Sequence, residues 1–345
     1  MSATSKLTVN VANPANNLIF ARVTAAQRDA HFDSNNPPEL GMLIFNDDDK
    51  VLEFWNGTEW AVALGERTGG GGAARYDFQS FEFEESSTES RNGPDLNYVT
   101  GRISGNDGWK NNSEYLSVNA GVWEWMAPQT GNYTIECWGA QGGRSNCWGP
   151  NGGTGAYAKG TVQLKGGKMY KIVVGRKGSN NCYDSGGGGM TGIIDEDNAA
   201  VVVAGGGGGG SASGMNGPGP FNGSASSTGG STAWGSGGSN GQGGWGGTAG
   251  GGGGVSQQGQ GSWYGNSFVG GAVGGPGPGP GGFGGGGGGG GTNGAGGGGG
   301  YSGGAASYWS FYGAGGGSYV TPDATGSVTQ SGGKTNGGKI KITKV

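Results

Sequence analysis

Hydrophobic and polar residues alternate in short segments along much of the chain, which is the pattern of half-buried β-strands. Near the start, the segments 42–45, 51–55 and 59–64 are separated by turn residues and predict a small β-meander of three strands. Thr24 is a capping residue before a short helical stretch. Because so small a module buries little apolar surface, we expect association with other chains to stabilise it.

A second series of strands begins after residues 66–75, a glycine-rich stretch that predicts a flexible linker. The last alternating segment, 339–345, lies far from its predecessor and must complete a sheet that began earlier. We therefore expect residues 76–345 to form a β-sandwich that carries residues 205–317 as an insertion. The segments that predict its other strands are 78–83, 115–118, 122–126, 133–137, 162–164, 170–174, 192–194 and 200–204.

Half of the insertion is glycine, 56 of the 113 residues from 205 to 317. Collagen is excluded because glycine does not recur at every third position. Glycine-rich chains are usually disordered, but aromatic residues recur in this segment, and disordered segments have few. Glycine chains can also pack as polyglycine II helices, which hydrogen-bond to their neighbours, and we expect this arrangement. Because each bond contributes only about 0.5–1.5 kcal/mol, the bundle needs the sandwich and buried aromatic rings as anchors.

Charge and hydropathy exclude several classes of partner. The net charge is −4 and the 20 Lys and Arg residues are spread along the chain, so we expect no nucleic acid partner. The longest apolar runs, such as 201–204, are far shorter than the ~18 residues of a membrane span, so we expect no membrane insertion. The polar residues 1–13 do not resemble an export signal, which predicts assembly in a reducing cytoplasm. That compartment argues against a bridge between Cys147 and Cys182, but the sequence leaves the question open.

Residues near the start resemble a short module that is common in bacteriophage tail fibres and other virion structural proteins. The resemblance rests on residues 24–30, 37–46 and 52–60, and its most specific part is the Asn-Gly-Thr-x-Trp ending. It implies that residues 1–65 attach the chain to other virion tail proteins, and we expect a homotrimer. The aromatic residues that we assign to virion attachment are Phe45, Phe54, Trp55 and Trp60.

Residues 115–345 resemble the glycine-rich domain of anaplastic-lymphoma-kinase-type receptors and its phage and bacterial relatives. The resemblance implies an all-β fold, a jelly-roll-like β-sandwich carrying a bundle of polyglycine II helices, that recognises a ligand or receptor without catalysis. We expect the phage branch, because the chain shows no membrane span or kinase domain. The motifs that carry the resemblance lie at 123–128, 131–135, 139–143, 153–156, 172–175, 201–206, 300–304 and 315–319.

Residues suited to catalysis or metal binding are scarce. His31 is the only histidine, so any Ser/His/Asp triad or Cys/His dyad would have to include it. We interpret it as an ordinary surface residue. The acidic triplets 47–49 and 195–197 fall where hairpin turns are predicted, and neither follows an EF-hand pattern. We therefore expect no enzymatic activity, no cofactor and no bound metal.

Aromatic residues of the insertion divide into two groups. Phe283, Tyr301 and Tyr319 stand at the edges of glycine runs, where we expect them to act as wedges between the glycine helices and the sandwich. Others lie in longer polar breaks with few aliphatic neighbours, and exposed Trp and Tyr on a rigid frame are typical of recognition surfaces. Whether these contact a receptor or pack inside the protein stays open. They are Trp234, Trp245, Trp263, Tyr264, Tyr308, Trp309, Phe311 and Tyr312.

These patterns predict a structural protein of the virion tail, assembled in the host cytoplasm. The favoured function is that of a tail fibre or tail-tip adhesin, with a host cell-surface glycan or outer-membrane protein as receptor. A passive virion decoration, or a neck or head fibre component without receptor specificity, is the alternative. A polysaccharide-degrading fibre is disfavoured, because the strands offer no paired carboxylates in a groove.

Overall fold

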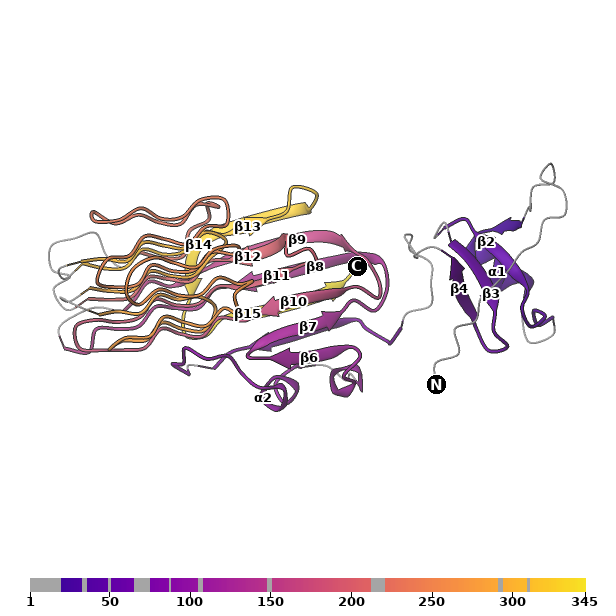
Figure 1. Ribbon diagram of the computed structural model, residues 1–345, viewed down its shortest axis with the longest axis horizontal. Helices are drawn as coiled ribbons and strands as arrows, with labels where there is room; N and C mark the ends of the chain where they lie inside the picture. The colour runs from indigo at the N-terminus through magenta and orange to yellow at the C-terminus, as the bar shows by residue number, and fades with distance from the viewer. Residues whose placement is uncertain are drawn as a thin grey trace. The chain divides into compact units, whose positions relative to one another are not determined.

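The structure is a computed structural model. It describes residues 20–32, 36–48, 51–64, 75–86, 88–104, 108–147, 151–211, 221–290, 294–308 and 311–345. The chain divides into two compact units, residues 1–73 and residues 74–345, each of which is drawn in Figure 1. The division falls within the stretch 66–75, of which only Arg75 is described.

The N-terminal unit contains a four-stranded sheet and one helix. Its elements in chain order are β1 (Ala21–Val23), α1 (Ala25–His31), β2 (Leu43–Asn46), β3 (Val51–Trp55) and β4 (Trp60–Leu64). The predicted helix cap is confirmed, because Thr24 Oγ1 accepts a hydrogen bond from the Gln27 N–H at 3.1 Å. Gln27 Oε1 accepts one in return from the Thr24 N–H at 2.9 Å, which completes a capping box.

The predicted meander of three strands is confirmed, but β1 adds a fourth strand parallel to β2. β1 is too short for its side chains to show alternation, and it reaches β2 only through the crossover that contains α1. A buried ion pair holds that helix on the sheet, with 2.6 Å between Arg28 Nη1 and Glu53 Oε2. The sheet therefore depends on a long-range contact that no local pattern predicts.

The C-terminal unit is an all-β sandwich of two antiparallel sheets, as predicted. Its strands are β5 (Ser80–Glu84), β6 (Leu116–Asn119), β7 (Val122–Met126), β8 (Gly131–Trp138), β9 (Gly155–Leu164), β10 (Met169–Val173), β11 (Thr191–Ile194), β12 (Ala200–Ala204), β13 (Tyr319–Val320), β14 (Thr325–Lys334) and β15 (Lys339–Lys344). One sheet has the order β13-β12-β11-β10-β7-β6, and the other has the order β14-β9-β8-β15-β5. Two short helices, α2 (Leu96–Thr100) and the 3₁₀ helix η1 (Gly108–Asn111), were not predicted.

The last strand of the chain lies inside a sheet, which confirms that it completes a sheet begun earlier. β15 pairs with β5 on one side and with β8 on the other, and its side chains Ile340 and Ile342 are fully buried. β13 and β14 escaped prediction because β13 has two residues and β14 contains mostly Ser, Thr and Gly.

Aromatic side chains fill much of the space between the two sheets. Phe81 and Phe83 of β5 pack against Trp123 and Trp125 of β7, and the ring centroids of Phe83 and Trp123 are 4.8 Å apart. The two rings meet edge to face, the arrangement that their quadrupoles favour. Cys137 is buried in the same core, and burial raises the pKa of its thiol.

Glycine runs lie side by side beyond the strand ends (Figure 1). The run Gly205–Gly210 is buried, and the N–H groups of residues 206–210 donate to carbonyl groups of other segments. The segment that accepts the hydrogen bond changes with each residue and recurs after three residues. Gly206 and Gly209 donate to Gly299 and Gly296 of one segment, and Gly207 and Gly210 donate to Ala140 and Gly143 of another. Gly208 donates to Phe221 of a third segment. A Cβ placed on any residue from 205 to 209 would lie 1.8–2.3 Å from a backbone oxygen of another segment. Only glycine fits these positions.

Loops of the sandwich itself belong to the same layer. Gly188, between β10 and β11, donates to the carbonyl oxygen of Gly207 at 2.8 Å, and Gly153, just before β9, donates to that of Gly208 at 2.8 Å. The layer therefore extends beyond the insertion at 205–317 that glycine density suggests. The frequency of glycine along the sequence shows where glycine is abundant. Whether a segment belongs to the glycine layer depends instead on which backbones pack against each other.

Phe283 anchors the glycine runs on the outer face of the six-stranded sheet. It is fully buried in a cluster with Phe268 and with Val203 of β12. A Cβ on Gly93 would lie 2.7 Å from the Phe283 ring, and one on Gly121 would lie 2.8 Å from it. The prediction that Phe283 acts as a wedge is confirmed.

A disulfide joins Cys147 to Cys182, whose Cα atoms are 4.8 Å apart. This differs from the expectation based on a reducing compartment. The two cysteines lie in loops that pair directly, since Ser145 forms a β-bridge with Asn181 and the Asn146 N–H donates to the Asn181 carbonyl at 2.9 Å. Packing of these loops brings the two sulfur atoms together, and the 35-residue separation in sequence does not reveal it.

Candidate functional site

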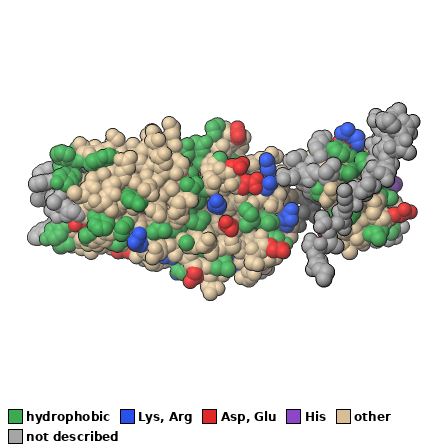
Figure 2. Space-filling view, viewed as in Figure 1, with side chains coloured by type: hydrophobic (Ala, Val, Ile, Leu, Met, Phe, Trp, Pro, Cys, Tyr) green, Lys and Arg blue, Asp and Glu red, His purple; other side chains and the backbone are tan. Residues whose placement is uncertain are grey.

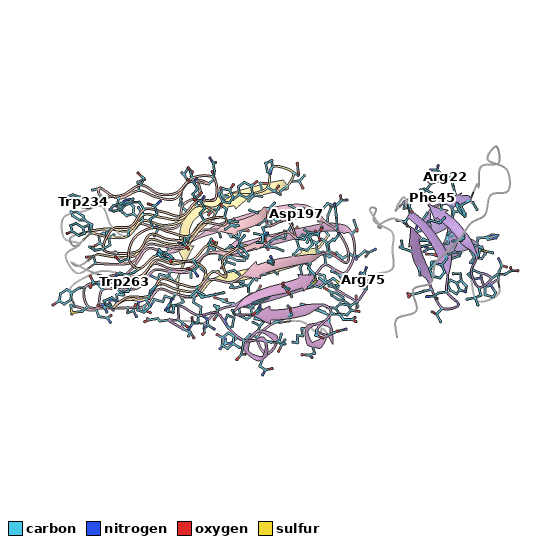
Figure 3. All side chains as sticks on the ribbon, in the orientation of Figure 1. Arg22, Phe45, Arg75, Asp197, Trp234 and Trp263 are labelled. Carbon is cyan, nitrogen blue, oxygen red and sulfur yellow. A yellow bond between two sulfur atoms is a disulfide. The ribbon has the colours of Figure 1, made fainter. Side chains whose placement is uncertain are left out.

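Three aromatic side chains meet at one end of the C-terminal unit, and we call Trp234, Tyr308 and Phe311 the distal aromatic cluster. The ring centroid of Trp234 lies 6.3 Å from that of Tyr308 and 6.5 Å from that of Phe311. Trp234 is 51% exposed, and the other two side chains are partly buried. Figure 3 shows Trp234 at the opposite end of the unit from Arg75, where the described part of the unit begins.

A tight turn presents Trp234 to solvent. The Thr232 N–H donates to the Gly235 carbonyl at 2.8 Å, and the two residues form a β-bridge around the turn. Thr232 Oγ1 donates to the Ala306 carbonyl at 3.0 Å and accepts from the Trp234 N–H at 3.3 Å. These bonds satisfy the backbone of the turn, so the indole is held out by a fixed frame.

Trp245 supports the same turn from beneath. A Cβ on Gly235 would lie 2.2 Å from the Trp245 ring, so only glycine allows the turn to rest on this indole. The Trp245 carbonyl also accepts a hydrogen bond from the Ala306 N–H at 2.8 Å. Its side chain is 37% exposed, so Trp245 both packs and contributes to the surface beside the cluster.

Trp263 lies away from the distal aromatic cluster, as the separate labels of Trp234 and Trp263 in Figure 3 show. Trp263 packs as a wedge, because a Cβ on Gly290 would lie 2.5 Å from its Nε1 atom and one on Gly277 would lie 3.2 Å from its ring. Tyr264 is partly exposed. The structure therefore gives Trp263 the packing role that the sequence left open.

Tyr312 is the clearest correction to the predicted contact residues. Its side chain is only 3% exposed, and burial raises the pKa of its hydroxyl. A buried ring offers no surface to a receptor, so we remove it from the candidate site. Trp309, which was predicted beside it, lies outside the described residues.

Residues assigned to virion attachment divide between the two faces of the N-terminal sheet. Trp55 pairs with Trp60 across β3 and β4, and their ring centroids are 5.6 Å apart. Phe45 and Phe54 lie on the other face, because neighbouring residues of a strand point to opposite sides. All four side chains are partly buried, and the Arg22 guanidinium lies 5.0 Å from the Phe45 ring centroid. They form two separate surfaces.

The residues with potential for catalysis or metal binding do not converge. His31 is exposed at the end of α1, with its ring against that of Phe32. Asp195 shapes the predicted turn, since its Oδ1 accepts hydrogen bonds from the Asp197 and Ala199 N–H groups at 3.0 and 2.8 Å. Within the described ranges, no three His, Cys, Asp or Glu side chains gather as metal ligands.

Charged side chains are unevenly distributed over the C-terminal unit. On the face drawn in Figure 2, acidic and basic groups gather over the sheets, and few lie over the glycine-rich end. On this face, the described surface of that end is mostly uncharged. No helix in the described part of the chain is long and apolar enough to span a membrane.

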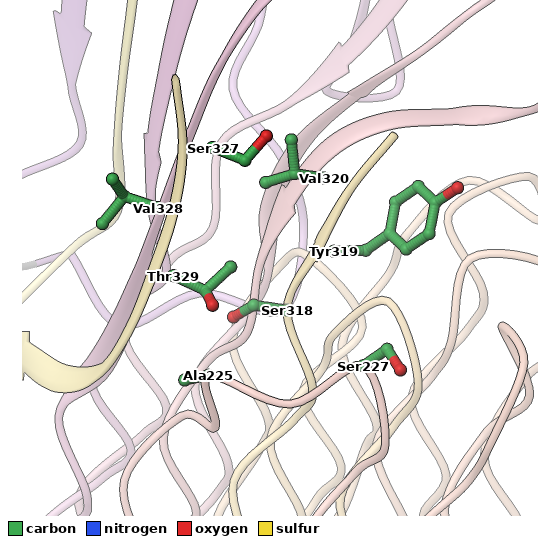
Figure 4. Close-up of a pocket in the computed structure, with 8 residues that line it drawn as sticks. All are labelled: Ala225, Ser227, Ser318, Tyr319, Val320, Ser327, Val328 and Thr329. Atoms are coloured by element: carbon green, nitrogen blue, oxygen red, sulfur yellow. The ribbon is translucent and has the colours of Figure 1, made fainter. Parts of the chain in front are cut away.

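One further surface was missed by sequence reasoning, a groove between β13 and β14. Hydroxyl groups line it, among them those of Ser227, Ser327 and Thr329 (Figure 4). Its signal in the sequence is the recurrence of Thr or Ser at positions 325, 327, 329 and 331. That pattern is a strand alternation without apolar residues, which a search for hydrophobic periodicity passes over.

Comparison with known proteins finds a family that resembles the N-terminal unit. Residues 2–73 match a family described as the phage tail-like trimerisation region. No curated protein matches the chain. The match covers β1 to β4 and α1 of the N-terminal unit, and it does not extend into the C-terminal unit. It supports a phage tail-type structural protein, a virion component whose chains associate as a trimer.

Proposed function

We propose that this chain is a tail fibre or tail-tip adhesin, assembled in the host cytoplasm, that attaches the virion to a receptor on the host cell surface. A glycan or an outer-membrane protein is the receptor, and the chain acts by binding rather than by catalysis. The single observation that carries the proposal is the distal aromatic cluster, which is held on a fixed turn at the end of the unit remote from Arg75. Exposed Trp and Tyr on such a frame are typical anchors of recognition.

The frame behind the cluster is, in this proposal, a bundle of polyglycine II helices. The three-residue return of hydrogen-bond partners along Gly205–Gly210 supports it, since three residues make one turn of this helix. Bonds leave the run towards three other segments, so this helix is tied to several neighbours at once. Such cross-linking stiffens the bundle and lowers the entropy that the aromatic side chains lose on binding.

The N-terminal unit supplies attachment and multiplicity. Its trimerisation brings three distal clusters onto one particle component, so that weak single contacts combine through avidity. Other tail proteins bind, in this proposal, to the surfaces that carry Phe45, Phe54, Trp55 and Trp60.

Replacing Trp234, Tyr308 and Phe311 together by serine is expected to reduce adsorption of the purified, labelled chain to host cells at least tenfold. The loss follows because each truncated anchor removes apolar contact area, and a hot-spot residue contributes about 2 kcal/mol or more. The matched control is Leu96→Ser on α2, which removes an exposed apolar side chain from the sandwich and leaves adsorption unchanged.

Adsorption of the triple variant at the wild-type level would remove the distal aromatic cluster from the function. Failure of the wild-type chain to adsorb would instead favour a passive decoration of the virion. Release of reducing sugar from host polysaccharide would overturn the non-catalytic assignment.

Charging the exposed apolar residues of the N-terminal unit is expected to dissociate the trimer. Leu40 is 78% exposed and Val62 is also exposed, and both gain from burial between chains. A Leu40→Glu, Val62→Glu variant would bury unpaired carboxylates, at a cost of at least about 2 kcal/mol, or about thirtyfold in association. Sedimentation of the full chain measures this, with Glu39→Gln as the neighbouring control. A trimer that persists undiminished in the double variant would show that both residues lie outside the interface.

A further inference from the structure

The two sheets end unequally at one edge of the sandwich. β13, at the edge of the six-stranded sheet, has two residues, whereas β14, at the edge of the five-stranded sheet, has ten. So short a strand covers little of the β14 face turned towards it. Residues 325–331 of β14 are all exposed, although they belong to a hydrogen-bonded strand of the sandwich.

The uncovered face of β14 carries hydroxyl groups where a sandwich normally places apolar side chains. Thr329 pairs with Ala158 of β9, and Ala158 is fully buried in the core, so both residues lie on the inner face. Along β9 the inner face continues with the apolar side chains Val162 and Leu164. The change to Thr and Ser on β14 marks the point where the core ends and a polar surface begins.

The uncovered face borders a groove of about 240 Å³. Figure 4 shows Ser318 and Val320 along one wall, Ser327 and Thr329 along the other, and Ser227 below them, with the Tyr319 ring directed away from Ser327 and Thr329. None of the described residues that line the groove is acidic or basic. At this size it is slightly smaller than the pockets that hold drug-sized molecules, about 300–1,000 Å³.

Several of these hydroxyl groups are available to a ligand. Ser318 Oγ accepts a hydrogen bond from the Gly205 N–H at 3.1 Å, and Ser327 Oγ donates to the Ala324 carbonyl at 3.4 Å. The hydroxyl groups of Ser227 and Thr329 make no hydrogen bond to the described residues. Each can donate one hydrogen bond and accept two.

The two walls of the groove are held in place. Tyr319 pairs with Val203, whose side chain lies on the outer face of the six-stranded sheet, so the Tyr319 ring points away from the β14 wall. The ring of Tyr319 stacks on that of Tyr301 with 4.2 Å between centroids and 13° between planes. The stack joins β13 to the glycine run that ends at Tyr301, so the β13 wall of the groove has a fixed position. On the opposite wall, β14 is fixed by its hydrogen bonds to β9.

We propose that this groove binds one sugar residue of a neutral saccharide. Sugar hydroxyls donate and accept at once, which matches hydroxyl side chains that do the same, and the lining side chain Val320 offers an apolar contact to the C–H groups of the sugar. The absence of lining charges selects against phosphorylated or acidic sugars, whose charge would be desolvated without a partner. The site rests on the proposed adhesin function and names a glycan as ligand, at a place separate from the distal aromatic cluster.

Saturation-transfer difference NMR on the full-length chain tests the site, with D-glucose, D-galactose and N-acetyl-D-glucosamine as separate probes. At least one sugar is expected to receive saturation from the wild-type chain. In a Ser227→Ala, Thr329→Val variant the apparent affinity is expected to fall about tenfold, because two hydrogen-bonding hydroxyls are lost while the shape is retained. Thr343→Val, on the outer face of β15, makes the same chemical change elsewhere and leaves binding unchanged.

The outcomes separate the groove from the proposed function. No transfer to any of the three sugars, or undiminished transfer with the double variant in its native fold by near-ultraviolet circular dichroism, overturns the groove. Sugar binding that depends on Ser227 and Thr329 supports the groove as a binding site, even if the wild-type chain fails to adsorb to cells. Failure to adsorb would count only against the adhesin function. Adsorption without any sugar binding leaves the adhesin and removes the groove.

Discussion

Replacing Gly207 by alanine is expected to unfold the glycine-rich half of the C-terminal unit. The new Cβ would lie 1.9 Å from the carbonyl oxygen of Gly153 and 2.3 Å from its carbonyl carbon, whereas non-bonded heavy atoms normally stay about 3.5 Å apart. Gly153 has no room to retreat, since its N–H donates to Gly208 and its carbonyl accepts from Gly142. The backbone conformation of Gly207 is not in the left-handed region, so lack of space alone excludes the methyl group.

The free energy of unfolding is expected to fall by at least about 3 kcal/mol, because overpacking costs about 1–3 kcal/mol even where flexible side chains can adjust. Denaturant titration measures the change, and amide hydrogen exchange shows whether it is confined to the glycine runs. Gly108→Ala is the control, because a Cβ there meets nothing within 4 Å. Equal stability of the two variants would refute the close backbone packing.

Removing Glu85 is expected to destabilise the C-terminal unit by about 3–5 kcal/mol, because it leaves the Arg176 charge buried without a partner. Glu85 is 0% exposed and Arg176 is 9% exposed, with 2.9 Å between Oε1 and Nε. The Tyr98 hydroxyl donates to the other carboxylate oxygen at 2.8 Å. Arg176 also binds backbone, since its Nη1 donates to the Asn92 carbonyl at 3.0 Å. The pair thus ties the segment before α2 to the loop after β10.

Glu85→Ala is the variant, and thermal or denaturant unfolding is the measurement. The neighbouring Glu84→Ala is the control, because Glu84 pairs with Lys334 at 2.7 Å but is half exposed, and such pairs contribute about 0–1 kcal/mol. Glu85→Gln is expected to fall between the two, since its amide oxygen still accepts from Tyr98 or Arg176. Similar losses for Glu84→Ala and Glu85→Ala would contradict a special role for the buried pair.

The predicted elements are those in which local side-chain pattern and final environment agree. Ile340 and Ile342 alternate with lysines and are buried between β5 and β8, so the pattern reported the burial directly. β14 failed this test because Ser327 and Thr329 face a groove rather than a core. The candidate site was predicted in part, since Trp234, Tyr308 and Phe311 meet, while Tyr312 of the same segment is buried.

By itself, the amino-acid sequence determined an all-β chain with a small N-terminal module. It also determined glycine runs that can pack with their backbones in direct contact, because glycine has no Cβ atom. Alternation and the absence of Cβ atoms are properties of each segment, so they can be recognised without knowing its neighbours. Only the tertiary structure decided which loops join the glycine layer, which cysteines bond and which aromatic rings stay exposed. Those outcomes depend on contacts between residues far apart in sequence, as the meeting of Gly207 with Gly153 and of Trp234 with Tyr308 shows.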